Sequence, residues 1–233
     1  MLELRKIAAG YGQTQVLYDI SLRIGSGEVV TLLGRNGMGK TTTIYTLMGA
    51  VRSWSGEISF RDTALGGLPP YKVARQGIAL VPEGRQIFPT LSVLENLVAT
   101  ASNRTGAADP WTIERIYALF PQLAERRNSA ANLLSGGEQQ MLAIGRALMT
   151  NPHLVIFDEA TEGLAPLARQ EIWNCLRRLK EMGQAILLID KNLAPLCELA
   201  DRHVVVHKGR TVWEGTSAQL LAPDSEGKHY LEL

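Results

Sequence analysis

The sequence predicts an α/β fold built on a largely parallel, doubly wound sheet. Two observations lead to this expectation: short, almost continuous apolar runs rich in Val, Ile and Leu, and helical patterns between them. Apolar runs without alternation are typical of strands that are buried on both faces of a sheet. Strands that alternate with helices indicate a doubly wound core. The five apolar runs are Val29–Leu33, Ile78–Val81, Leu154–Phe157, Ala185–Ile189 and Val204–Val206.

Two regions depart from this alternation. The start of the chain has glycine turns at 10–12 and 25–27, and with the stretch Ser55–Arg61 it is expected to form antiparallel strands. Residues 84–148 have the pattern of helices and contain no strand-like run. We therefore expect one domain over residues 1–233. Its α/β core carries an N-terminal antiparallel β subdomain and a helical insertion at about 85–148.

Composition and charge exclude several classes of function. Hydrophobic residues make up 45% of the chain and charged residues 20%, which is typical of a globular protein. With 24 Lys+Arg against 23 Asp+Glu there is no basic excess, so no nucleic-acid partner is expected. No apolar run reaches the ~20 residues that span a bilayer. We therefore expect a cytoplasmic protein that reaches the membrane through a partner.

A glycine-rich segment points to a phosphate-binding site. Residues 34–41 match G-x-x-x-x-G-K-[ST], directly after the apolar run Val29–Leu33 and at the start of a helical pattern. Glycines in this context let backbone amides surround phosphate oxygens at the positive end of a helix. Lys40 is expected to contact the β- and γ-phosphates of ATP, and Thr41 to hold Mg²⁺. The alternative, an incidental glycine turn, leaves the flanking strand and helix unexplained. The expected nucleotide contacts here are Gly34, Arg35, Asn36, Gly37, Met38, Gly39, Lys40, Thr41 and Thr42.

Two carboxylates follow a buried strand. Asp158 and Glu159 come directly after the apolar run Leu154–Phe157. Ligands of open α/β sheets lie at the carboxyl ends of the strands. We therefore expect Asp158 to bind Mg²⁺ through water, and Glu159 to polarise the water that attacks the phosphate. The alternative is an acidic exit from a strand without catalytic meaning.

A second glycine pair lies at another helix start. Ser135 and Glu138 form an S-x-x-E capping box. Between them, Gly136 and Gly137 allow close approach of an anion to the helix N-terminus. One nucleotide does not need two phosphate-binding surfaces from one chain, whereas a dimer does.

At these motifs the sequence resembles the ABC transporter ATPases, whose signature is L-S-G-G-[QE]-Q, and the resemblance covers essentially the whole chain. It implies a P-loop NTPase core of the RecA-like type. Tyr11 matches the aromatic residue that stacks on adenine. Glu83 stands where the family has Gln, and is expected to contact nucleotide and metal. The resemblance also implies a nucleotide held between the phosphate loop of one subunit and Ser135, Gly136, Gly137 and Glu138 of the other.

Longer strings are similar to one branch, the branched-chain amino-acid importers, and most of all to the shorter of their two ATPase subunits. The strings are Val81–Arg85, Leu134–Leu148 and Glu162–Pro166. This similarity implies import of hydrophobic amino acids or related small amides, and a position on the inner face of the membrane. It implies a second ATPase subunit (in isolation, a homodimer instead), two transmembrane permease subunits and, indirectly, an extracytoplasmic solute-binding protein. The permease is expected in a groove near Glu83, Gln86, Phe88, Leu94 and Glu95.

Three positions depart from the family's pattern. Ala160 replaces a usual Pro, Ala165 stands near a usual Asp, and Lys191 aligns with a histidine. Lys191 is expected to contact the γ-phosphate and assist catalysis; the alternative is a solvated charge. Because of these departures, one alternative function stays open: a module in which ATP clamps the chain to its partner ATPase but is hardly cleaved. A non-transport ABC ATPase acting on DNA or the ribosome is the other alternative, but there is neither a basic excess nor a second cassette.

Overall fold

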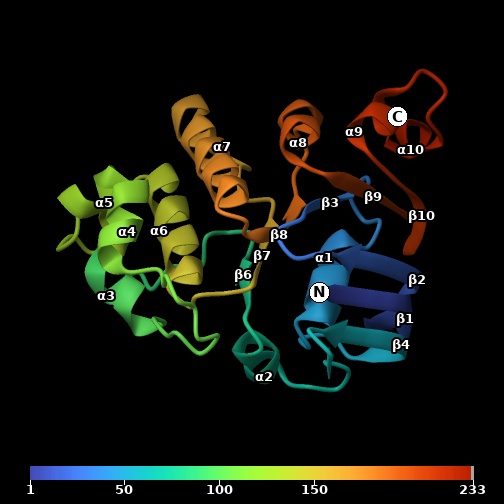
Figure 1. Cartoon of the computed structure of the whole chain (residues 1–233), viewed down its shortest axis with the longest axis horizontal. Helices are drawn as coiled ribbons and strands as arrows, with labels where there is room; N and C mark the ends of the chain where they lie inside the picture. The colour runs from blue at the N-terminus through green and yellow to red at the C-terminus, as the bar shows by residue number, and fades with distance from the viewer. Residues whose placement is uncertain (232–233) are drawn as a thin grey trace.

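The computed structural model describes residues 1–231, whose ten strands form one curled sheet in the order β5-β4-β1-β2-β10-β9-β3-β8-β7-β6 (Figure 1). The strands are β1 Leu2–Tyr11, β2 Thr14–Ile24, β3 Val29–Leu33, β4 Ser53–Phe60, β5 Thr63–Ala64, β6 Ile78–Val81, β7 Leu154–Asp158, β8 Ala185–Ile189, β9 Arg202–His207 and β10 Arg210–Gly215. The helices are α1 Lys40–Leu47, α2 Pro70–Arg75, α3 Val93–Ala99, α4 Ile113–Leu119, α5 Pro121–Glu125, α6 Gly136–Leu148, α7 Pro166–Glu181, α8 Leu193–Leu199, α9 Ser217–Leu221 and α10 Glu226–Leu231, with a 3₁₀ turn at Ala131–Leu133.

The core of the sheet is parallel, as the sequence predicts. Strand β3 pairs in parallel with β8 and β9, and β7 pairs in parallel with β6 and β8. Both faces of these strands are buried: Val29 and Leu33 pack with helices α6 and α7, whereas Val30 and Leu32 pack with α1. This two-sided burial is the reason that the runs are continuously apolar. The carboxyl ends of β3, β7 and β8 meet at one edge.

The antiparallel part is also confirmed. Strand β1 pairs antiparallel with β2 on one side and β4 on the other. One detail differs, because Gly56 lies inside β4 rather than at its boundary. Gly56 has φ +88, and a Cβ there would lie 2.5 Å from the carbonyl oxygen of Arg5, at a point where the register shifts. The glycine therefore permits a bulge in the strand.

Helices α3 to α6 gather at one end of the molecule, away from the antiparallel strands (Figure 1). The segment is less helical than the sequence suggests, because residues 100–112 contain no helix. Buried Asn96 organises the approach to α3: its Nδ2 donates to the carbonyls of Phe88, Leu91 and Ser92. The buried side-chain amide thus provides a hydrogen-bond donor for backbone carbonyl groups that have no partner within a helix.

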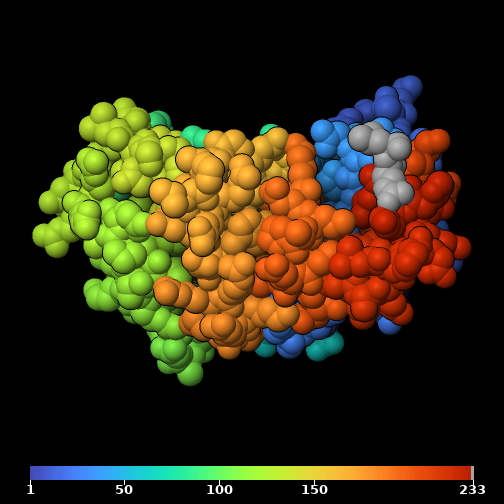
Figure 2. Space-filling model, turned by 90° about the horizontal axis from the view of Figure 1, so that it is seen from above, coloured from blue at the N-terminus to red at the C-terminus, as the bar shows by residue number. Residues whose placement is uncertain are grey.

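Helices α7 and α8 cover one face of the sheet, and α9 and α10 pack against β9 and β10 on the same side (Figure 1). Seen from above, the insertion, α7 and the C-terminal helices follow one another from end to end (Figure 2). The predicted stripe of α7, formed by Ile172, Leu176 and Leu179, is buried. These layers leave open the edge at which β3, β7 and β8 end.

Candidate active site

The loop between β3 and α1 has a backbone that glycine permits. Gly34, Gly37 and Gly39 have φ values of 150, 77 and 105. A Cβ on Gly34 would overlap the carbonyl oxygen of Val206, and one on Gly39 would lie 2.7 Å from a methyl group of Leu17. Since L side chains avoid these φ values, the three glycines are needed for this loop conformation.

Lys40 is the first residue of α1, and its side chain folds back over the loop. The residue is 9% exposed, and its Nζ donates to the carbonyls of Gly34 at 2.9 Å and Arg35 at 3.1 Å. Burial lowers the pKa of Lys40, and the carboxylates of Glu159 and Asp158 partly offset this effect. An ammonium group with a third N–H available is thus held inside the loop.

Asp158 ends β7 in an unusual environment for a carboxylate. It is 1% exposed, and neither carboxylate oxygen has a hydrogen-bond partner. Burial, together with the charge of Glu83, raises the pKa of Asp158 to about 6, against the opposing effects of the Thr41 hydroxyl and Lys40. Buried acceptors without donors are rare in folded proteins. Two such oxygens fit a site that takes a cation.

Glu159 follows on a turn with φ +51, and its N–H donates to the carbonyl of Ile189 at 2.9 Å. This bond fixes the turn against the end of β8. The carboxylate is mostly buried, and burial together with Glu162 raises the pKa of Glu159, while Lys191 lowers it. Glu159 therefore lies where the surroundings make it a stronger base than a free carboxylate.

Lys191 lies between two carboxylates. Its Nζ is 2.6 Å from Glu162 Oε1 and 3.1 Å from Glu159 Oε2. The hydrogen bonds that Lys191 donates to Glu162 and Glu159 raise the pKa of Lys191, so it is charged at neutral pH. Oxygen atoms of Glu83, Glu159 and Glu162 lie within 4.8 Å of one another. Sequence reasoning missed Glu162, whose only signal is its place three residues after Glu159.

One cavity of about 410 Å³ is lined by Lys40, Glu159, Glu162 and Lys191; the buried Asp158 is not among its described lining residues. The cavity brings together most of the residues expected from the phosphate loop with Glu83, Glu159 and Lys191. Its lining residues are Val16, Asn36, Gly37, Gly39, Lys40, Thr41, Thr42, Glu83, Glu159, Glu162 and Lys191. Gly34 and Arg35 line a neighbouring cavity of about 580 Å³ that shares Lys40 and Lys191 with the first. The cavity places cations, hydroxyls and carboxylates where a phosphate ester would meet all three.

Tyr11 and Met38 lie apart from this lining. Tyr11, at the end of β1, is 51% exposed. The side chain of Met38 packs against the core, and its Sδ accepts from the N–H of Lys208 at 3.2 Å. The stacking role of Tyr11 stays a prediction.

The second glycine pair begins α6 with the predicted capping box. Ser135 Oγ accepts from the N–H of Glu138, whose carboxylate accepts from the N–H of Ser135 at 2.7 Å. None of the residues 135–138 is among those described as lining the 410 Å³ cavity. A Cβ on Gly136 would lie 2.9 Å from the Arg85 guanidinium, and one on Gly137 would lie 2.5 Å from Ala168 Cβ. Packing against Ala168 therefore also requires Gly137, a reason that the sequence does not reveal, whereas the flexible Arg85 side chain can move away from a Cβ on Gly136.

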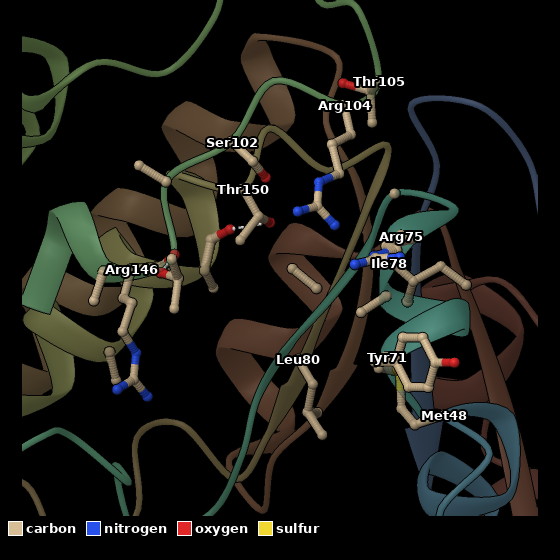
Figure 3. Close-up of a pocket in the computed structure, with 18 of the residues that line it drawn as sticks. Met48, Tyr71, Arg75, Ile78, Leu80, Ser102, Arg104, Thr105, Arg146 and Thr150 are labelled. Carbon is tan, nitrogen blue, oxygen red and sulfur yellow. Dashed lines mark hydrogen bonds between the residues drawn. The ribbon is translucent and has the colours of Figure 1, made fainter. Parts of the chain in front are cut away.

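A different cavity, of about 620 Å³, lies between the core and the helical insertion. Figure 3 shows Arg146 on the side of the insertion, and Arg75, Tyr71 and Met48 on the side of the core. Its described lining includes Arg75, Arg104 and Arg146 but no acidic residue. One buried nitrogen of Arg146, Nη1, has no hydrogen-bond partner, and burial lowers the pKa of this residue.

This cavity only partly matches the groove expected from the sequence. Phe88 lines it, beneath the Arg146 guanidinium at 4.6 Å from the ring centre. Gln86 contributes a carbonyl that accepts from Arg146 at 2.6 Å, and Glu95 is used in the capping box of α3. Glu83 lines the smaller cavity instead. The cavity thus lies toward α2 and residues 99–105, near the end of α3 rather than near its start at Leu94 and Glu95 as expected. Within residues 1–231, no helix is long and apolar enough to cross a membrane.

Comparison with known proteins gives consistent results. A family model described as ABC transporter matches residues 17–162. The chain is 41% identical over 231 residues to the high-affinity branched-chain amino acid transport ATP-binding protein BraG of Pseudomonas aeruginosa, covering 99% of both chains. It is 33% identical over 232 residues to the lipopolysaccharide export system ATP-binding protein LptB of Escherichia coli, covering 99% of this chain and 96% of LptB. The ADP conformation of the ATP-binding cassette MJ1267 superposes with a TM-score of 0.83 at 25% identity, over 100% of this chain and 99% of that one.

Proposed function

Because the chain belongs to the ABC transporter family, it binds nucleotide and hydrolyses ATP, and we propose that it energises the import of branched-chain or other hydrophobic amino acids, or of related small amides. The observation that carries this proposal is the 41% identity to BraG along 99% of both chains. The identity to the export protein LptB is lower, at 33%. The chain would act from the inner face of the membrane.

Hydrolysis takes place in the 410 Å³ cavity. The loop 34–39 surrounds the phosphates with backbone amides, and the ammonium of Lys40 turns from its carbonyl partners toward the β- and γ-phosphates. Glu159 accepts a hydrogen bond from the attacking water and aligns it with the γ-phosphate. The turn that fixes Glu159 against Ile189 keeps the carboxylate in place.

The donor set fits Mg²⁺. Asp158 offers two buried, unpartnered carboxylate oxygens, and the Thr41 hydroxyl lines the same region as Glu83. With a pKa of about 6, Asp158 is mostly ionised at neutral pH, which is the form that binds a metal or its water. When bound, Mg²⁺ neutralises charge on the β- and γ-phosphates. Asp158 and Thr41 would hold it, and Glu83 would face it.

A second ATPase subunit completes the site. Residues Ser135 to Glu138 begin a 13-residue helix, and in this chain they stand apart from the phosphate loop's cavity. A helix start that can bind an anion but lies apart from the phosphate loop of its own chain suits a partner's nucleotide. The partner is a non-identical ATPase in the transporter, or a second copy of this chain in isolation.

The permease subunits dock in the 620 Å³ cavity. Three arginines without an acidic neighbour in the lining, around an apolar floor that includes Leu80 and Ile78, favour an amphipathic segment that carries a carboxylate. The unpartnered Nη1 of Arg146 offers a donor for that carboxylate. The loop 82–86 contains Glu83, which lines the smaller cavity, and Gln86, whose carbonyl accepts from Arg146 of the larger one. Docking and hydrolysis therefore share one loop.

The test is solute-dependent ATP hydrolysis. The chain would be reconstituted in lipid nanodiscs with the permease and ATPase subunits encoded beside it and their solute-binding protein. Phosphate release should rise when leucine, isoleucine or valine loads the binding protein, and a Glu159→Gln subunit should remove this rise. Stimulation by lipopolysaccharide, with no response to any amino acid or amide, would contradict the proposed import function and favour an export function.

A further inference from the structure

The ion pairs of Lys191 join two loops that are far apart in the sequence. Glu162 lies in the turn after β7, and Lys191 follows β8, 29 residues later. Buried Asp190 ties the loops together, because it accepts from the Thr161 hydroxyl and from the N–H of Asn192 at 2.9 Å. The residues next to Glu162 and Lys191 in the sequence are thus fixed, which keeps the two charged side chains close to each other.

We propose that Glu162 is a positioning residue, which holds the Lys191 ammonium beside Glu159 until ATP arrives and thereby weakens the preference of the site for ATP over ADP. This inference rests on the proposed contact between Lys191 and the γ-phosphate. Lys191 and Glu162 line the same cavity as Lys40, so the ammonium lies within the cavity proposed to hold the γ-phosphate.

Exchange of partners follows from the donors available. A lysine ammonium has three N–H donors, and two of them point to Glu162 and Glu159. The third N–H is left for a γ-phosphate, so a second contact between the ammonium and the γ-phosphate requires Lys191 to release one of these carboxylates. ADP lacks the γ-phosphate and leaves the pair intact. The cost of separating Lys191 from Glu162 therefore falls on ATP alone.

The size of this cost is modest. Side-chain exposure is 50% for Lys191 and 47% for Glu162, so solvent screens the pair. Exposed ion pairs of this kind change an equilibrium by roughly two- to fivefold. Glu162→Gln keeps the shape of the side chain and removes its charge. It should raise the affinity for the β,γ-imido analogue of ATP by about two- to fivefold and leave that for ADP unchanged.

A double-mutant cycle separates positioning from plain charge repulsion. Affinities for the imido analogue and for ADP, both with Mg²⁺, would be measured by titration calorimetry for wild type, Glu162→Gln, Lys191→Met and the double variant. Glu162→Gln should have no effect in the Lys191→Met background. An equal rise in both backgrounds would mean that Glu162 only repels phosphate, and would overturn the proposal.

The other outcomes are equally distinct. If Lys191→Met changes neither affinity, the proposed γ-phosphate contact of Lys191 is wrong. If Lys191→Met weakens binding of the analogue but Glu162→Gln has no effect, only the role of Glu162 is wrong. Glu198→Gln is the matched control, since Glu198 is also exposed and pairs with Arg177 at 3.5 Å on α7 and α8; it should alter neither affinity.

Discussion

Replacing Asp158 by Asn is expected to stabilise the nucleotide-free protein while it abolishes ATP hydrolysis. The carboxylate is buried and has no hydrogen-bond partner at normal distance, and the nearby Thr41 hydroxyl and Lys40 only partly offset this, so the folded state disfavours its charge. Asn has the same shape and no charge, and therefore removes this unfavourable contribution. It also removes the group expected to hold Mg²⁺. Stability and activity should thus change in opposite directions.

The magnitude follows from the pKa of Asp158. Its rise from 3.8 to about 6 corresponds to about 3 kcal/mol of destabilisation above pH 7, at about 1.36 kcal/mol per pKa unit. Because the folded-state pKa is raised, this destabilisation is absent below pH 3.8, grows between pH 3.8 and 6, and is complete above that range. The buried amide of Asn costs about 1–2 kcal/mol in return. A net gain of about 1–2 kcal/mol at pH 7.5 corresponds to a Tm higher by about 2–8 °C.

The assay is thermal unfolding in the presence of a chelator, from pH 5 to pH 8. The advantage of Asp158→Asn over wild type should shrink by about 1 kcal/mol or more toward pH 5, because wild-type Asp158 then becomes protonated. Adding Mg²⁺ and ATP should reverse the order by stabilising only the wild type.

Asp190→Asn is the matched control. Asp190 is also buried, but its carboxylate accepts from Thr161 and from both nitrogens of Asn192. The same substitution should there destabilise the protein by about 1–3 kcal/mol. If Asp158→Asn also destabilises the protein, by the same amount at pH 5 and pH 8, the carboxylate of Asp158 is not an unsatisfied charge and the reasoning fails.

Three further substitutions test side chains that line the 410 Å³ cavity. Lys40→Ala should reduce ATP affinity at least tenfold and abolish phosphate release, since a buried cation beside the phosphates is lost; normal turnover would remove Lys40 from the site. Glu159→Gln should keep ATP bound but slow cleavage at least a hundredfold, and ATP should then produce a dimer on a sizing column; a variant that stays monomeric with ATP, even when mixed with its partner ATPase, would contradict the shared site. Lys191→His should raise the hydrolysis rate, because a neutral imidazole can accept a hydrogen bond from water and an ammonium cannot; an unchanged steady-state rate would leave Lys191 without a catalytic role.

The sequence predicted the parallel core and the phosphate loop because local patterns encode both. Continuous apolar runs report burial on two faces, and the glycines at 34, 37 and 39 report φ values that other residues avoid. Asp158 and Glu159 were predicted as site residues for the same reason, since Asp158 ends a buried strand and Glu159 follows it.

Long-range contacts were not predictable in this way. The pairing of Lys191 with Glu162 depends on how two loops meet after β7 and β8, and no local pattern records that distance. Similarly, the sequence alone predicts an anion site at Gly136 and Gly137, whereas in the fold Ala168 also packs closely against Gly137. The 620 Å³ cavity is lined by arginines from three separate segments of the chain, so the sequence predicted its position only in part.

The central claim is that ATP is cleaved in the cavity that Lys40 and Glu159 line, with Mg²⁺ held by the buried Asp158. Its most direct test is a crystal structure of the Glu159→Gln variant grown with Mg²⁺ and ATP. The account predicts the γ-phosphate beside Lys40, Mg²⁺ near Thr41 and Asp158, and residues 135–138 of a partner subunit closing over the nucleotide. A nucleotide bound elsewhere, for instance among the arginines of the 620 Å³ cavity, or a metal remote from Asp158, would contradict it.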